Sequence, residues 1–210
     1  MTDDLSDAQL LERHGSGHTD AFEALVRLHQ GPLLRHAFGL LGPGRPAEDV
    51  VQEAFIKLAQ QPPSLHEEVV GDARAERAAL ASWLHKVTRN LCMDLLRSES
   101  RRKRREQEVA PGEAAGGGFE DVDLVDTKEA VTRSLERLPQ DQREVLVLRL
   151  LGEKTYKEIS SITGKKVGTV GWLVSVGLKA LASELTPLLG GAPGCDFQVP
   201  GLTPARGELS

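Results

Sequence analysis

The residues best suited to metal binding or catalysis are six histidines and two cysteines in a chain of 210 residues. His14 and His18 are four positions apart, but two glycines between them disfavour the helix that would bring both imidazoles to one metal ion. The cysteines form no CxxC or CxxH motif, and no nucleophile elbow, acidic pair or glycine-rich phosphate loop stands out. We therefore expect no enzymatic activity, no metal site and no cofactor, and we expect His36 and His85 on helix surfaces.

Charge is unevenly distributed along the chain. The formal net charge of −5 would by itself argue against a nucleic-acid partner. However, residues 97–105 hold six Lys or Arg and one Glu, and residues 106–126 hold seven Asp or Glu and no Lys or Arg. A basic helix end followed by an acidic linker is therefore the strongest compositional feature.

The sequence gives no sign of export or membrane insertion. The longest apolar run without charge, residues 167–178, has 12 residues, and a membrane-spanning helix needs roughly 20. The N-terminus is acidic where a secretory signal is positively charged. We expect a cytoplasmic protein without a membrane span.

Helical periodicity dominates the sequence. Apolar residues recur at helical spacing in 21–41, 46–60 and 78–105, and the aromatic content of only 4% also disfavours a β-sandwich. We predict an all-α protein of two small helical domains joined by a flexible, acidic, Gly-rich linker. The predicted segments are an N-terminal helical bundle (1–106), the linker (107–123), a helix-turn-helix domain (124–186) and a Pro/Gly-rich tail (187–210).

Two predicted helices of the first domain carry opposite charges on their polar faces. In 46–60 the polar face is acidic. This face is either a binding surface or an ordinary solvated surface, because acidic residues are favoured near a helix N-terminus in any case. In 78–105 the polar face is basic, which suits phosphate contacts, although cations near a helix C-terminus also compensate the helix dipole. Trp83 beside it is either a stacking aromatic or a core residue. The acidic stripe is Glu48, Asp49, Gln52 and Glu53, and the basic stripe is Lys86, Arg89, Asn90, Arg97, Arg101 and Arg104.

The second domain has a helix-turn-helix pattern. Thr155 and Glu158 form a capping box that opens a short helix, residues 163–166 form a turn, and Thr169 can cap a longer last helix. By itself this pattern is only moderately specific.

Three stretches occur in a characteristic order: AEDVVQEAFIKL (47–58), ASWLHKVTRNLCMDLLR (81–97) and LERLPQDQREVLVLR (135–149), the last followed by YKEIS (156–160). Together they resemble the sigma-70 family of bacterial RNA polymerase sigma factors, in particular its extracytoplasmic-function (ECF) group. The resemblance implies a factor that binds core RNA polymerase and directs promoter recognition and DNA melting for transcription initiation.

The resemblance also implies roles for the two stripes. The acidic stripe matches positions that dock on the largest polymerase subunit. The basic stripe, with Trp83, matches the helix that meets promoter DNA, and Lys165 and Lys166 would touch phosphates near the upstream element.

The last helix departs from the family pattern. Positions that are usually basic hold Gly171, Leu173, Val176 and Leu178, so we expect Trp172, Leu173 and Val176 to point outward and form a protein-contact patch. Either the tail or another polypeptide, such as an anti-sigma factor or other regulatory protein, would cover it. The alternative function is therefore a sigma-like interaction protein whose C-terminal domain binds a regulatory protein rather than minus-35 DNA.

Overall fold

The structure, a computed structural model, describes residues 5–109 and 127–188, and every regular element in these ranges is a helix. The all-α prediction is therefore confirmed. In chain order the helices are α1 (Asp7–Gly15), α2 (Thr19–Leu41), α3 (Ala47–Gln60), α4 (Ala73–Val109), α5 (Thr127–Arg137), α6 (Gln140–Leu150), α7 (Tyr156–Thr163) and α8 (Val167–Leu188). No helix in these ranges is long and apolar enough to cross a membrane.

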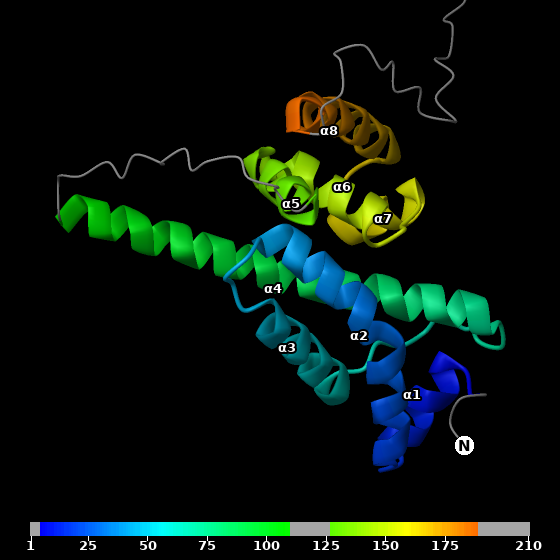
Figure 1. Ribbon diagram of the computed structural model, residues 1–210. Coiled ribbons are helices and arrows are strands. Elements are labelled where there is room, and N and C mark those ends of the chain that lie inside the picture. The colour runs from blue at the N-terminus through cyan, green and yellow to red at the C-terminus, as the bar shows by residue number, and fades with distance from the viewer. Residues whose placement is uncertain (1–4, 110–126, 189–210) are drawn as a thin grey trace, which may run out of the picture.

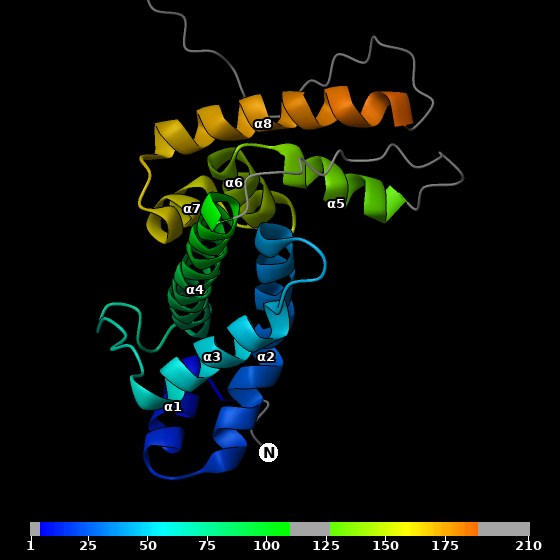
Figure 2. The ribbon, with the colours of Figure 1, turned by 90° about the vertical axis from the view of Figure 1, so that its left-hand side faces the viewer.

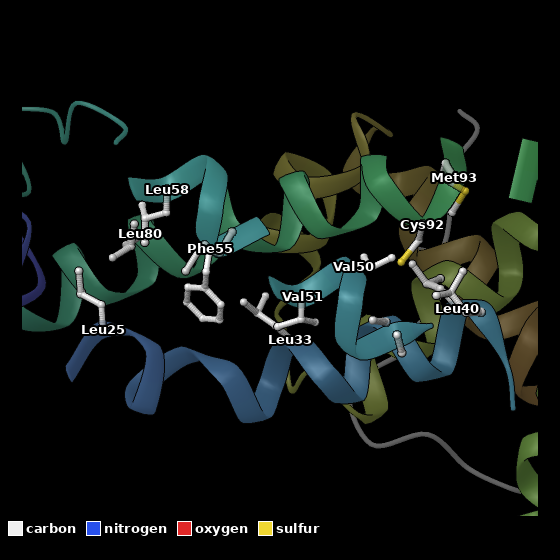
Figure 3. Close-up of a cluster of buried hydrophobic side chains, with 14 of the residues drawn as sticks. Leu25, Leu33, Leu40, Val50, Val51, Phe55, Leu58, Leu80, Cys92 and Met93 are labelled. Atoms are coloured by element: carbon white, nitrogen blue, oxygen red, sulfur yellow. The ribbon is translucent and has the colours of Figure 1, made fainter. Parts of the chain in front are cut away.

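Helices α1 to α4 form the N-terminal bundle, with α2 packed against α1, α3 and α4. Leucines from α2, α3 and α4 meet in its centre, including Leu25, Leu58 and Leu80 (Figure 3). The apolar face expected for 46–60 is buried in this core, except that Ala59 is exposed. The acidic side of α3 is thereby turned to solvent.

Helix α4 is longer than the sequence predicts at both ends. It begins at Ala73 rather than 78 because the Asp72 carboxylate accepts hydrogen bonds from the backbone N–H groups of Arg74 (2.9 Å) and Ala75 (3.1 Å). It ends at Val109, so the first three residues assigned to the linker are helical. The rest of the expected linker, 110–123, lies outside the described residues, as does the tail from 189 onward.

Helices α5 to α8 form the C-terminal domain. The capping box at α7 is confirmed, because the Thr155 N–H donates to Glu158 Oε2 (2.8 Å) and the Glu158 N–H donates to Thr155 Oγ1 (3.3 Å). Gly164 follows α7 in the left-handed conformation (φ 74°), which gives the turn its glycine. Helix α8 begins at Val167, two residues before the expected cap at Thr169.

The two domains pack directly on each other. Helix α6 lies against α2, and α7 lies against α4, with α8 on the far side of the C-terminal domain (Figures 1 and 2). The contact is close at Gly39, where a Cβ atom would lie 2.6 Å from Val147 Cγ1. We call this the closed arrangement.

Candidate nucleic-acid interface

The acidic stripe lies on the open side of α3. Glu48, Asp49, Gln52 and Glu53 are all exposed, because Val51 and Phe55 on the other face anchor the helix in the core. Only Glu53 has a charged partner among the ion pairs of the described residues, and its 3.6 Å contact with Lys57 is a surface pair within one helix turn. The stripe therefore presents negative charge that the fold leaves accessible.

Most of the basic stripe also faces solvent. Lys86, Asn90, Arg97, Arg101 and Arg104 are exposed on α4. Arg97 bonds Asp94 one turn earlier (2.9 Å), with both side chains about two-thirds exposed, which is too weak a pair to remove Arg97 from binding.

Trp83 is not part of that exposed row. It is half-buried and packs against the core of the N-terminal bundle. The structure therefore favours the core interpretation of this residue over a freely exposed stacking aromatic.

Arg89 is the member of the stripe that the fold has engaged. Its guanidinium forms a short ion pair with Glu144 of α6, whose side chain is only 1% exposed. Lys165 approaches the same carboxylate at 3.8 Å and bonds Asp141 at 2.9 Å. Two residues predicted to touch DNA are thus held by carboxylates of the C-terminal domain.

Sequence reasoning missed Glu144. The feature of the sequence that could have indicated a buried carboxylate is its position directly before the apolar run Val145–Leu148, whose residues are all buried in α6. A buried carboxylate requires a cationic partner, but the sequence alone does not say that the partner comes from α4.

The outer face of α8 differs from the expectation at one position. Trp172 is 62% exposed and Val176 is half-buried, but Leu173 is only 6% exposed and belongs to the domain core. The prediction that Leu173 points outward was wrong, because it lies with Val170 and Val174 on the face that packs against the other helices. Lys166 is exposed at the start of α8.

Three histidines lie inside the N-terminal half rather than on its surface. His36 and His85 are buried with their Nδ1 atoms 3.1 Å apart, so the surface expectation was wrong for both. Burial, together with nearby cations including Lys154, lowers the pKa of His36 to about 3 and that of His85 to about 2. Both are therefore neutral at pH 7 and serve packing rather than chemistry.

The third, His29, contacts the buried Asp7 carboxylate. Its Nε2 lies 2.8 Å from Asp7 Oδ2, and Arg77 Nε lies 3.1 Å from Asp7 Oδ1. Burial opposes ionisation of Asp7, but these two partners outweigh it and lower the carboxyl pKa. These contacts tie α1 to α2 and α4.

Comparison with known families identifies both domains. Residues 25–102 match sigma-70 region 2, and residues 128–181 match sigma-70 region 4. The chain belongs to the ECF group of the sigma-70 family. The region 2 match contains the whole acidic stripe and the basic stripe as far as Arg101, and the region 4 match contains the helix-turn-helix of this sigma-family chain.

Two relatives show how far the similarity extends. A probable ECF RNA polymerase sigma factor, SigI of Mycobacterium tuberculosis, is 34% identical over 157 residues, which is 71% of this chain and 50% of the relative. The chain thus spans about half the length of that protein. The ECF RNA polymerase sigma-E factor of Escherichia coli is 29% identical over 200 residues, covering 90% of this chain and 99% of the relative.

Solved structures share the fold. The sigma factor RpoE of Bartonella quintana, in complex with the anti-sigma factor NepR, has a TM-score of 0.57 at 24% identity and covers 79% of this sigma-family chain and 96% of its own. CnrH in complex with the cytosolic domain of CnrY has a TM-score of 0.57 at 20% identity. The match covers 85% of this chain and 96% of CnrH.

Proposed function

We propose that this chain is a sigma factor of transcription initiation, acting in the cytoplasm without catalysis of its own. The acidic stripe on α3 binds core RNA polymerase, and the basic stripe on α4 binds promoter DNA where the strands separate. The observation that supports this is that two neighbouring helices of one rigid bundle present opposite charges to solvent. Such surfaces select partners and accelerate encounter.

Run-off transcription with purified core polymerase tests the proposal. A variant with Lys86, Asn90 and Arg97 changed to Ala should still bind polymerase but lose template-specific initiation, because each side chain is exposed and supports no core contact. Initiation at the wild-type level would contradict the DNA role of α4.

A second pair of variants tests the polymerase surface. Glu48→Gln with Glu53→Gln should weaken binding to core polymerase. The matched control is Glu67→Gln with Glu68→Gln, which removes two exposed carboxylates outside α3. Equal weakening in both variants would indicate a general charge effect and not a docking stripe.

The closed arrangement implies a step before promoter binding. Because Glu144 holds Arg89, the C-terminal domain has to move away from α4 before Arg89 reaches DNA. The acidic stripe lies on α3 and not on α6, so we expect polymerase binding at the stripe and movement of the C-terminal domain to be separate events.

The alternative, a sigma-like protein whose C-terminal domain binds a regulatory protein, is supported by the exposed Trp172. An exposed aromatic side chain on the helix that usually reads DNA suits a protein partner. One similar solved structure is a sigma factor in complex with the anti-sigma factor NepR. If Trp172→Ala leaves run-off transcription unchanged and Lys166→Gln does too, the minus-35 role of this domain is contradicted and the alternative is favoured.

A further inference from the structure

A cationic pocket lies at the junction of the two domains. Its volume is about 370 Å³, and its walls come from the loop before α3, from the C-terminal half of α4 and from the first turn of α6. Four cations and one carboxylate line it, which leaves an excess of three positive charges: Arg45, Arg97, Lys103 and Arg143, with Glu99. We call it the seam pocket.

Arg143 is held rigidly at the edge of α6. Its Nε donates to the Leu135 carbonyl oxygen (2.8 Å), Nη1 donates to that of Leu40 (3.3 Å), and Nη2 donates to that of Glu136. Among the described residues no carboxylate forms an ion pair with it. The fold therefore fixes a half-buried cation and leaves its charge without an ionic partner.

The neighbouring cations increase this imbalance. Burial lowers the pKa of Arg143; the charge of Glu136 opposes that effect and the charge of Arg45 adds to it. Arg45 bonds Glu99 (2.9 Å) and the Leu41 carbonyl, so the single carboxylate of the pocket is already engaged. A further anion would relieve the repulsion that remains among the cations of the pocket after Glu99 has paired with Arg45 and Asp94 with Arg97.

The N-terminus of α6 adds to the same field. The residue before it, Pro139, provides no side-chain cap for the first-turn N–H groups, and the exposed Asp141 is the acidic residue of that turn. The Gln140 side chain and Ser100 also line the pocket and add hydrogen-bond donors.

We propose that the seam pocket binds a phosphate group, which then bridges the two domains and favours the closed arrangement. Guanidinium groups match phosphate oxygens in pairs, and a doubly charged anion suits three excess cations better than a carboxylate. The phosphate comes either from a free phosphate ester or from a nucleic-acid backbone. The inference concerns the chain without polymerase and does not depend on the proposed function.

Calorimetric titration of the full chain with inorganic pyrophosphate, at fixed ionic strength, tests the site. Arg97→Gln and Lys103→Gln should each weaken binding by about tenfold. The matched control is Arg102→Gln on the same helix, which pairs with Glu106 and does not line the pocket. Absent binding, or equal weakening in the control, would overturn the proposal.

Hydrogen exchange tests the bridge. Pyrophosphate should slow exchange in peptides covering both 96–103 and 140–143, since the pocket draws on α4 and α6. Protection of the α4 peptide alone would overturn the bridging claim.

A single-stranded oligonucleotide separates the two sources of phosphate. If it displaces pyrophosphate and loses affinity in Lys103→Gln, whose side chain lines the pocket but is not part of the basic stripe, the backbone is the source. If its affinity is unchanged in Lys103→Gln although pyrophosphate binding is lost, the ligand is a free phosphate ester.

Discussion

Arg89 of α4 and Glu144 of α6 form an ion pair across the domain boundary, with the carboxylate almost fully buried. Arg89 belongs to the stripe proposed to bind promoter DNA where the strands separate. Glu144 belongs to the C-terminal domain, which contains the helix-turn-helix. The pair therefore couples the arrangement of the domains to the availability of one DNA-binding side chain.

Removing the Glu144 charge should increase DNA binding by the free chain. Glu144→Gln keeps the shape of the side chain but removes the charge that pairs with the Arg89 guanidinium, so Arg89 is held less tightly and affinity for a single-stranded promoter fragment should rise severalfold in fluorescence anisotropy. The matched control is Glu184→Gln, which removes a carboxylate of the same domain that pairs with Arg137 and not with Arg89 or Lys165. Unchanged affinity in Glu144→Gln would show that the pair does not limit DNA binding.

The close approach at Gly39 gives a second way to open the domains. In Gly39→Ala the new Cβ would lie 2.6 Å from Val147 Cγ1, so the packing of α2 on α6 must shift. We expect the domains to move apart and the radius of gyration in solution scattering to increase. Gly31→Ala on the same helix is the control, because its Cβ would meet only the Arg35 side chain at 3.6 Å. If both variants scatter alike, the closed arrangement is not held at Gly39.

Two glycines of α8 should respond in opposite directions to alanine. Gly177→Ala would place a Cβ 2.9 Å from Leu146 Cδ1 and should lower the free energy of unfolding of the C-terminal domain. Gly171→Ala meets the Tyr156 ring at 3.7 Å, an ordinary contact, and should gain about 0.5–1 kcal/mol from helix propensity. Urea denaturation measures both, and stabilisation by Gly177→Ala would contradict the close packing of α8 on α6.

The buried histidines make stability depend on pH. Their folded pKa values of about 3 and about 2 lie below the ordinary value of 6.5, so below pH 6.5 the unfolded chain binds more protons than the folded chain. The free energy of unfolding should therefore fall as pH drops from 6.5 toward 3, by up to about 1.4 kcal/mol per pH unit for each histidine.

Urea denaturation between pH 7.5 and 5 measures this slope. A variant with His36→Asn and His85→Asn should show a smaller slope whatever its absolute stability. In addition, the imidazole NMR signals of both histidines should not shift above pH 5. A titration near pH 6.5 would contradict their burial.

Much of the molecule could be read from local patterns. Helical spacing of Val51, Phe55 and Leu58 predicted which side of α3 is buried, and this left the acidic stripe on the open side. The capping box at Thr155 and the turn at residues 163–166 predicted the helix-turn-helix, and the structure has both. These features depend on residues a few positions apart, where periodicity and capping act.

Other features required contacts between distant segments. Leu173 was misassigned because the sequence shows an almost wholly apolar helix and does not say which side meets α5, α6 and α7. His36 and His85, 49 positions apart, are buried because α2 and α4 pack together. Periodicity within one helix carries no information about its neighbour.

The sequence by itself determined the helical fold class, the capping box of α7 and the two charged stripes, since each arises from propensity and spacing within one helix. Only the tertiary structure decided that Glu144 takes Arg89 out of the basic stripe and that Arg143 joins cations of α4 in the seam pocket. The physical reason is that pairing and burial of charge depend on which surfaces of the two domains meet.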